Sequence, residues 1–224
     1  MPKRKVPLVS EEIYHVFNRS VAQQPIFRNR REHNIFTNLI EYYRFSYPPK
    51  RFSHYQRLAN EERVELLNNL YLKNKTLVEI YSFCLMPNHY HILLKQKSEN
   101  GIKDFIRLAQ NSYSRYLNIK TKRFGALFQS PFKATRVDSD EQFIHVARYI
   151  HLNPLTTYLL KDLSSLSIYE WSSYIDYVGN NPRRFLNTSF LMFIIKDKER
   201  FKKFTADNLD YQRKLDKIKH LIID

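Results

Sequence analysis

The sequence has few of the residues that would indicate a secreted, membrane-spanning or thiol-dependent protein. Cys84 is the only cysteine, which excludes an intramolecular disulfide and a cysteine-rich zinc site. No apolar run approaches the length of a membrane span. Residues 1–9 lack the apolar core and cleavage site of a secretory signal. We therefore expect residence in the cytoplasm, and association with the nucleoid when the protein binds DNA.

Acidic residues are also scarce relative to basic ones. Lys and Arg number 37 against 22 Asp and Glu, the formal net charge is +15, and aromatic residues make up 15% of the chain. Basic side chains neutralise phosphates and release counterions, and exposed rings stack on unpaired bases. Composition thus favours single strands or hairpins as partners. It also suits a protein that is basic for solubility and keeps its aromatic rings in the core.

Only three glycines occur, and no repeat or low-complexity block is present. With 224 residues and 43% hydrophobic content, the chain is long enough for one well-packed domain with extensions. We expect a domain over residues 1–178 with an insertion at about 45–74, and a basic helical extension over 179–224. Cys84, between Phe83 and Leu85, is expected to be a small buried apolar side chain.

Apolar periodicity predicts the element order β-α-β-β-α-β-α. Strands are expected at 12–17, 76–85, 89–95 and, interrupted near Ser130-Pro131, at 126–137. Helices are expected at 31–43, at 102–119, and from 141 to a stop near Pro154, with further helices at 60–72, 190–203 and 209–223. This order predicts an α+β, ferredoxin-like (RRM-like) antiparallel sheet with helices packed on one face. The open face of such sheets often binds single strands.

Two histidines flank a tyrosine in the apolar segment MPNHYHILL at 86–94. In a strand, alternate side chains share a face, so His89 and His91 would lie side by side while Tyr90 points the other way. Such a pair provides half of a metal site. The alternative is a partly buried structural pair.

The helix that begins near residue 141 carries a second pair of polar groups. Tyr149 and Asn153 are four residues apart and share one helix face. The Asn153 amide oxygen can bind a hard cation. Tyr149 can act as a nucleophile if a cation or base favours its phenolate. The alternative is a core aromatic and a helix stop before Pro154.

Two other tyrosines compete with Tyr149 as nucleophile. Tyr113 and Tyr116 lie on the helix expected at 102–119, but neither has an amide or carboxylate four residues on. His145 and His151 are near Tyr149 in sequence. The alternatives for each are a local partner of Tyr149 or a solvent-facing residue, and we assign a role to neither.

Four motifs agree in order with those of a known family. They are LMPNHYHIL at 85–93, GALFQ at 125–129 followed by Phe132-Lys133, YIHLNP at 149–154 and WSSY at 171–174. The upstream Phe17-Asn18-Arg19 and Ile26-Phe27 also agree. From Glu12 to Val178 the chain closely resembles the REP-associated tyrosine transposases, which are single-tyrosine HUH enzymes of the IS200-like superfamily.

The resemblance implies a role for each matched residue. His89, His91 and Asn153 correspond to the ligands of Mg²⁺ or Mn²⁺, and Tyr149 to the nucleophile. The implied reaction cleaves single-stranded DNA near a hairpin, and leaves a 5′-phosphotyrosine and a free 3′-hydroxyl. The chain departs from the family pattern in its insertion, in its extension and in lacking an arginine near Pro131. The resemblance therefore specifies the reaction more closely than it specifies which hairpin is recognised.

Two other classes of function are compatible with the sequence. One is a domesticated, non-cleaving binder of structured DNA or RNA. The other is a metal-dependent phosphodiesterase that uses water in place of tyrosine. The sequence does not decide between a monomer and a homodimer, and it indicates no membrane partner.

Overall fold

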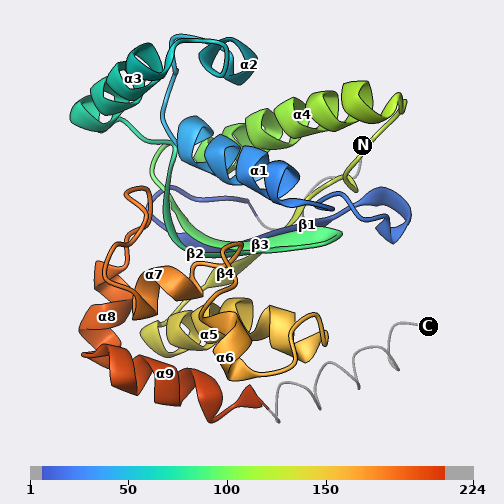
Figure 1. The fold of residues 1–224 in the computed structure, drawn as a ribbon. Helices are drawn as coiled ribbons and strands as arrows, with labels where there is room; N and C mark the ends of the chain where they lie inside the picture. The colour runs from blue at the N-terminus through green and yellow to red at the C-terminus, as the bar shows by residue number, and fades with distance from the viewer. Residues whose placement is uncertain (1–6, 210–224) are drawn as a thin grey trace.

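A four-stranded antiparallel sheet lies at the centre of the computed structural model, which describes residues 7–209 (Figure 1). Its strands are β1 (Ile13–Arg19), β2 (Val78–Met86), β3 (His89–Gln96) and β4 (Lys133–Val137). They are arranged in the order β2-β3-β1-β4. Apart from the helices of the insertion, one helix connects β1 to β2 and another connects β3 to β4. This is the ferredoxin-like topology, so the expected α+β class is confirmed.

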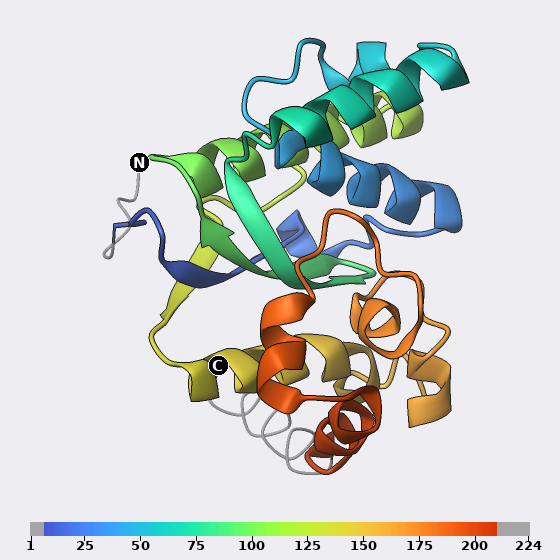
Figure 2. The same ribbon diagram turned by 90° about the vertical axis from the view of Figure 1, so that its left-hand side faces the viewer.

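Helices cover both faces of the sheet (Figures 1 and 2). The pair expected for this fold, α1 (Arg30–Tyr43) and α4 (Gly101–Thr121), packs on one face. The other face is not open over β2 and β3, because α5 (Asp140–Thr156) contacts both strands. The part of this face formed by β4 is more accessible, and Lys133 and Thr135 are exposed there.

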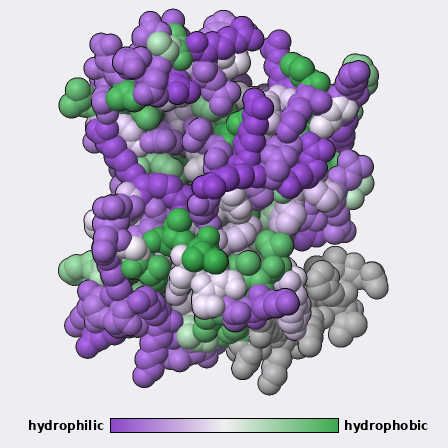
Figure 3. Space-filling model, viewed as in Figure 1, coloured by the Kyte–Doolittle hydropathy of each residue, from purple (hydrophilic) through white to green (hydrophobic). Residues whose placement is uncertain are grey.

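Smaller helices complete the two layers. The insertion contains α2 (Phe52–Tyr55) and α3 (Asn60–Lys73), and a 3₁₀ turn, η1 (Val21–Gln23), follows β1. Beneath the sheet lie α6 (Leu163–Leu166), α7 (Tyr174–Val178), α8 (Ser189–Ile195) and α9 (Lys198–Ala206). In Figure 3, hydrophilic residues cover much of the upper layer and hydrophobic residues gather on the lower one. Among residues 7–209, no helix is long and apolar enough to cross a bilayer.

Each layer has its own hydrophobic core, as the alternation of buried side chains along the strands requires. Val16, Tyr90 and Ile92 face α1 and α4, whereas Cys84 and Leu93 face α5 and the C-terminal helices. Burial of apolar surface stabilises the fold by about 25 cal/mol per Å². Cys84 is fully buried, as expected, and burial raises the pKa of its thiol.

Two predicted boundaries are wrong. The strand expected from 126 begins only at Lys133, since Pro131 has no N–H to give to a ladder and Phe128 makes a single bridge with Ser20. Helix α5 passes through Pro154 and ends at Thr156. A proline so near the end of a helix removes one hydrogen bond without interrupting a long ladder.

The expected helix at 190–203 is instead two helices, α8 and α9, which are separated at Lys196, where φ is 81°. Leu191 and Phe201 from these helices are fully buried beside α5 and α7. The helix expected at 209–223 lies outside the described residues, apart from its first position. The division into a domain over 1–178 and an extension over 179–224 stays a prediction.

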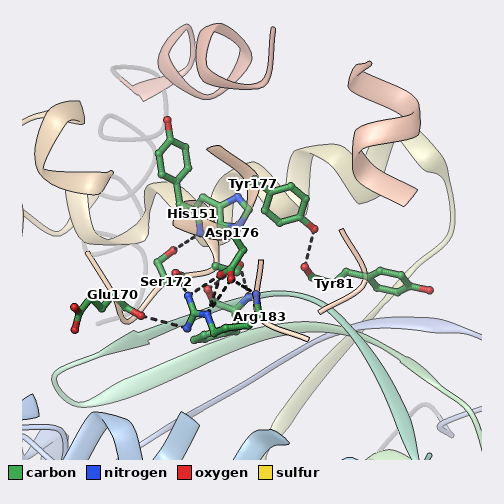
Figure 4. Close-up of polar contacts among 10 residues, drawn as sticks. Tyr81, His151, Glu170, Ser172, Asp176, Tyr177 and Arg183 are labelled. Atoms are coloured by element: carbon green, nitrogen blue, oxygen red, sulfur yellow. Dashed lines mark hydrogen bonds and ion pairs between the residues drawn. The ribbon is translucent and has the colours of Figure 1, made fainter. Parts of the chain in front are cut away.

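An ion pair between a part-exposed arginine and a buried aspartate attaches the segment after α5 to the sheet (Figure 4). Arg183 Nη2 lies 2.6 Å from Asp176 Oδ2, and the guanidinium sits 4.7 Å from the centre of the Phe83 ring on β2. Nearby, His151 Nε2 and Ser173 Oγ are 2.7 Å apart, and Ser173 Oγ accepts from Phe83 N at 2.8 Å. These contacts hold the far side of α5 at a set position relative to β2.

The start of α1 is joined to the end of α4 through Glu32. The Glu32 side chain is fully buried, and its carboxylate accepts hydrogen bonds from Arg28 at 2.7 Å and from Lys120 at 3.0 Å. Burial alone would raise the pKa of Glu32. The hydrogen bonds from Arg28 and Lys120 outweigh burial and lower this pKa to about 2.

Replacement of Glu32 by Gln is expected to lower the free energy of unfolding by about 2 kcal/mol at pH 7, since it leaves two cations without their buried partner. The folded pKa of about 2 lies below the unfolded value of about 4.3. The advantage of the wild type is thus complete above about pH 5 and is lost as the pH falls toward 2. Urea unfolding at pH 7, 4 and 3 measures this loss of stability.

Glu61→Gln, at an exposed position in the first turn of α3, is the control. A stability gap that stays constant from pH 7 to 3 would contradict the expectation.

Candidate active site

Strand β3 places the two histidines on one face of the sheet. Tyr90 is fully buried on the opposite face, where its hydroxyl accepts a hydrogen bond from Gln110 of α4 at 2.8 Å. His89 and His91 point to the α5 side, and their ring centres are 5.1 Å apart. The alternation that the sequence predicts is therefore confirmed.

Helix α5 brings Tyr149 and Asn153 to the same place. It begins at the N-cap Ser139, whose side chain accepts from Gln142 N, and buried Phe143 and Ile150 hold it against the core. The Tyr149 ring centre is 5.6 Å from that of His91, with the ring planes at 85°. The Asn153 side chain hydrogen bonds to His89.

The four predicted site residues thus form one cluster at the boundary between β3 and α5. His89 and His91 come from the strand, and Tyr149 and Asn153 come from the helix. Asn153 Nδ2 also donates to Tyr149 O at 3.3 Å. The amide oxygen is the atom of this side chain that is able to bind a cation.

Both imidazoles have their Nδ1 atom engaged by a neighbouring group. His91 Nδ1 is 2.9 Å from His15 Nε2, and His89 Nδ1 is 2.6 Å from Asn88 Oδ1. Histidines that bind metals usually donate their other ring N–H to such a partner, which orients the ring. If the two histidines bind a metal, this arrangement leaves Nε2 of each ring as the atom that would bind it. The donor set of two imidazoles and an amide oxygen fits a divalent cation.

The protonation state of His89 suits this role. Burial lowers its pKa to about 4, and the nearby charge of Arg19 acts in the same direction. The neutral imidazole that predominates at pH 7 is the form that binds metals. Within residues 7–209, no group of three or more His, Cys, Asp or Glu is arranged to hold a metal ion, so the amide of Asn153 is the third donor to consider.

Sequence reasoning missed three residues of this site. His15 and Arg19 lie on the same face of β1. This strand pairs with β3, where Arg19 lies opposite His89. Lys133 of β4 pairs with Phe17 and lies 6.0 Å from the centre of its ring. Alternation along β1 groups His15 with Arg19 on one face, but only the pairing of β1 with β3 shows that this face carries the site.

The competing residues lie elsewhere. Tyr113 and Tyr116 belong to α4 on the other face of the sheet, and the buried Tyr113 hydroxyl donates to Ile26 O. His151 is buried against Ser173, and burial lowers its pKa to about 3. His145 is exposed and contacts Arg148 Nη2 at 2.6 Å. None of the four contributes to the cluster.

Comparison with known proteins places the chain in a family. No curated protein matches it. A solved structure of a REP-associated tyrosine transposase bound to a REP hairpin is similar in fold, with 14% sequence identity, a TM-score of 0.47, and coverage of 80% of this chain and 86% of that one. The family model described as "Transposase IS200 like" matches residues 42–153, which is half of the chain and includes all four clustered residues. The chain belongs to the IS200-like transposase family.

Proposed function

We propose that this protein is a metal-dependent single-stranded DNA endonuclease and strand transferase that cleaves near DNA hairpins through Tyr149. One observation carries the proposal: a tyrosine and three suitable ligand side chains, from a strand and a helix distant in sequence, converge at a single point. Family membership supports the same class of chemistry.

The reaction is a transesterification. Tyr149 Oη attacks a backbone phosphorus and forms a new P–O bond, while the bond from phosphorus to the 3′ oxygen breaks. The phenolic proton goes to solvent, and the departing 3′ oxygen takes up a proton. The product is a 5′-phosphotyrosine with a free 3′-hydroxyl. One phosphoester replaces another, so the reverse reaction rejoins strands without ATP.

The side chains of this chain prepare that step. His89, His91 and Asn153 would hold Mg²⁺ or Mn²⁺, which supplies Lewis-acid stabilisation of the phosphate and favours the phenolate. Arg19 and Lys133 provide positive charge at the accessible edge of the site, where the charge of a DNA backbone must be neutralised. His15 orients the His91 ring through Nδ1.

Replacement of Tyr149 by Phe tests the nucleophile. Wild-type protein incubated with Mn²⁺ and a labelled single strand that carries hairpins should form a DNA adduct that survives denaturing electrophoresis. Tyr149→Phe should reduce adduct formation by about 10³-fold or more, as loss of a nucleophile does in other covalent enzymes. Tyr47→Phe, at an exposed position, is the matched control.

The other outcomes identify the competing functions. Cleavage without an adduct, equal in wild type and Tyr149→Phe, would indicate a phosphodiesterase that uses water. If the wild type binds hairpins but cleaves none of a panel of them, the result would indicate a domesticated binder. Either outcome would overturn the role of Tyr149.

Substitution of His15 tests the orientation of His91. His15→Phe keeps a ring but removes the partner of His91 Nδ1, so the affinity for Mn²⁺ should fall by about 10-fold or more. Adduct formation should recover at higher Mn²⁺. His15→Gln, which retains a polar group at a similar reach, should lose less affinity. Calorimetric titration with Mn²⁺ measures both variants, and thermal unfolding verifies their folding. Equal Mn²⁺ affinity in wild type and His15→Phe would show that His15 does not support the ligand.

A further inference from the structure

A pocket of about 660 Å³ lies between α1, the α2–α3 insertion and α4. Three arginines line it, two from α1 and one from α3, together with three amide side chains: Arg30, Arg31, Arg63, Asn34, Asn38 and Gln56. No acidic residue is among its lining residues. In Figure 3 the surface over α1 to α4 is largely hydrophilic.

The positive charge of this pocket is poorly compensated. Arg30 and Arg31 occupy the first turn of α1, where cations are unfavourable because the helix dipole is also positive. Among residues 7–209, the ion-pair partner of Arg30 is Glu170, at 2.9 Å, and both side chains are exposed. Arg31 forms no ion pair within the described part of the chain. Glu32, the acidic residue of this turn, is already bound by other cations.

The chemistry of the pocket suits phosphates more than bases. Guanidinium groups match the oxygens of a phosphate in a bidentate way, and amide groups add uncharged donors. Tyr116 is the only aromatic side chain among the lining residues, so the pocket has little surface on which unpaired bases could stack. Contacts of this kind position a nucleic acid without reading its sequence.

The pocket and the candidate active site are linked through the turn between β2 and β3. The backbone N–H groups of Ile26 and Phe27, just before α1, donate to Pro87 O at 2.7 and 3.0 Å. Pro87 lies two residues before His89. The arginine-bearing start of α1 therefore sits at the same end of the sheet as the histidines, in the opposite layer.

We propose that this pocket binds the phosphate backbone of a DNA hairpin stem, so that the flanking single strand reaches Tyr149. The inference rests on the proposed function and assigns part of the insertion, through Arg63 and Gln56, to substrate binding. A duplex stem has a higher charge density than a single strand, and it therefore gains most from three arginines in one pocket.

The test measures binding in a Tyr149→Phe background, where no covalent adduct forms. Fluorescence anisotropy is recorded between 50 and 200 mM salt for a hairpin and for an unstructured strand of equal length. Arg31→Gln and Arg63→Gln are added together. For the hairpin, the slope of log affinity against log salt should fall by about 0.9 for each lost phosphate contact, or by nearly 2 in total. The unstructured strand should be affected less. Arg200→Gln on α9, from an exposed pair with Asp197, is the matched control and should not change the slope.

An unchanged hairpin slope in the double variant, with folding verified by thermal unfolding, would overturn the proposal. Equal losses for the hairpin and the unstructured strand would overturn its assignment to the stem. Adduct formation by the wild type on the same hairpin is assayed separately. An adduct with an unchanged slope refutes the pocket alone, whereas an arginine-dependent slope without an adduct refutes only the proposed function.

Discussion

The position of the two candidate ligand histidines depends on the register of β3 between β1 and β2. A slip of one residue would turn the histidines into the core under α4 and bring Tyr90 into the site. Packing on the far face prevents this slip. The Tyr90 ring lies 5.2 Å from Phe36 and 5.9 Å from Phe128, and its hydroxyl is bound by Gln110. Apolar contacts on one face of the sheet thus determine the chemistry available on the other.

The two sides of α5 also have different roles. One side of this helix presents Tyr149 and Asn153 to the strand, while the other is anchored by His151 and the apolar core beneath it. The helix in turn rests on a segment that the Arg183–Asp176 pair attaches to β2. The geometry of the cluster is therefore maintained by residues that never approach the substrate.

The parts that the sequence predicts well are those with a local signal. Alternation placed His89 and His91 on one face, and helical spacing placed Tyr149 beside Asn153. Family resemblance joined the two halves. The contribution of His15 depends on pairing between β1 and β3, which no local pattern reveals. The covered face of the sheet could not be foreseen either, because it depends on where α5 returns after β4.

Order along the chain has a consequence for folding and synthesis. β1, which supplies His15, pairs with β3 and also with β4, so much of the sheet needs contacts between residues far apart in sequence. Such contacts form late, because long loops must close first. Asn153 and Tyr149 come after all four strands. A chain still emerging from the ribosome would hold the histidines without the proposed nucleophile, Tyr149. Under the proposed function, any intermediate that lacks α5 would therefore be unable to cut DNA before the protein is complete.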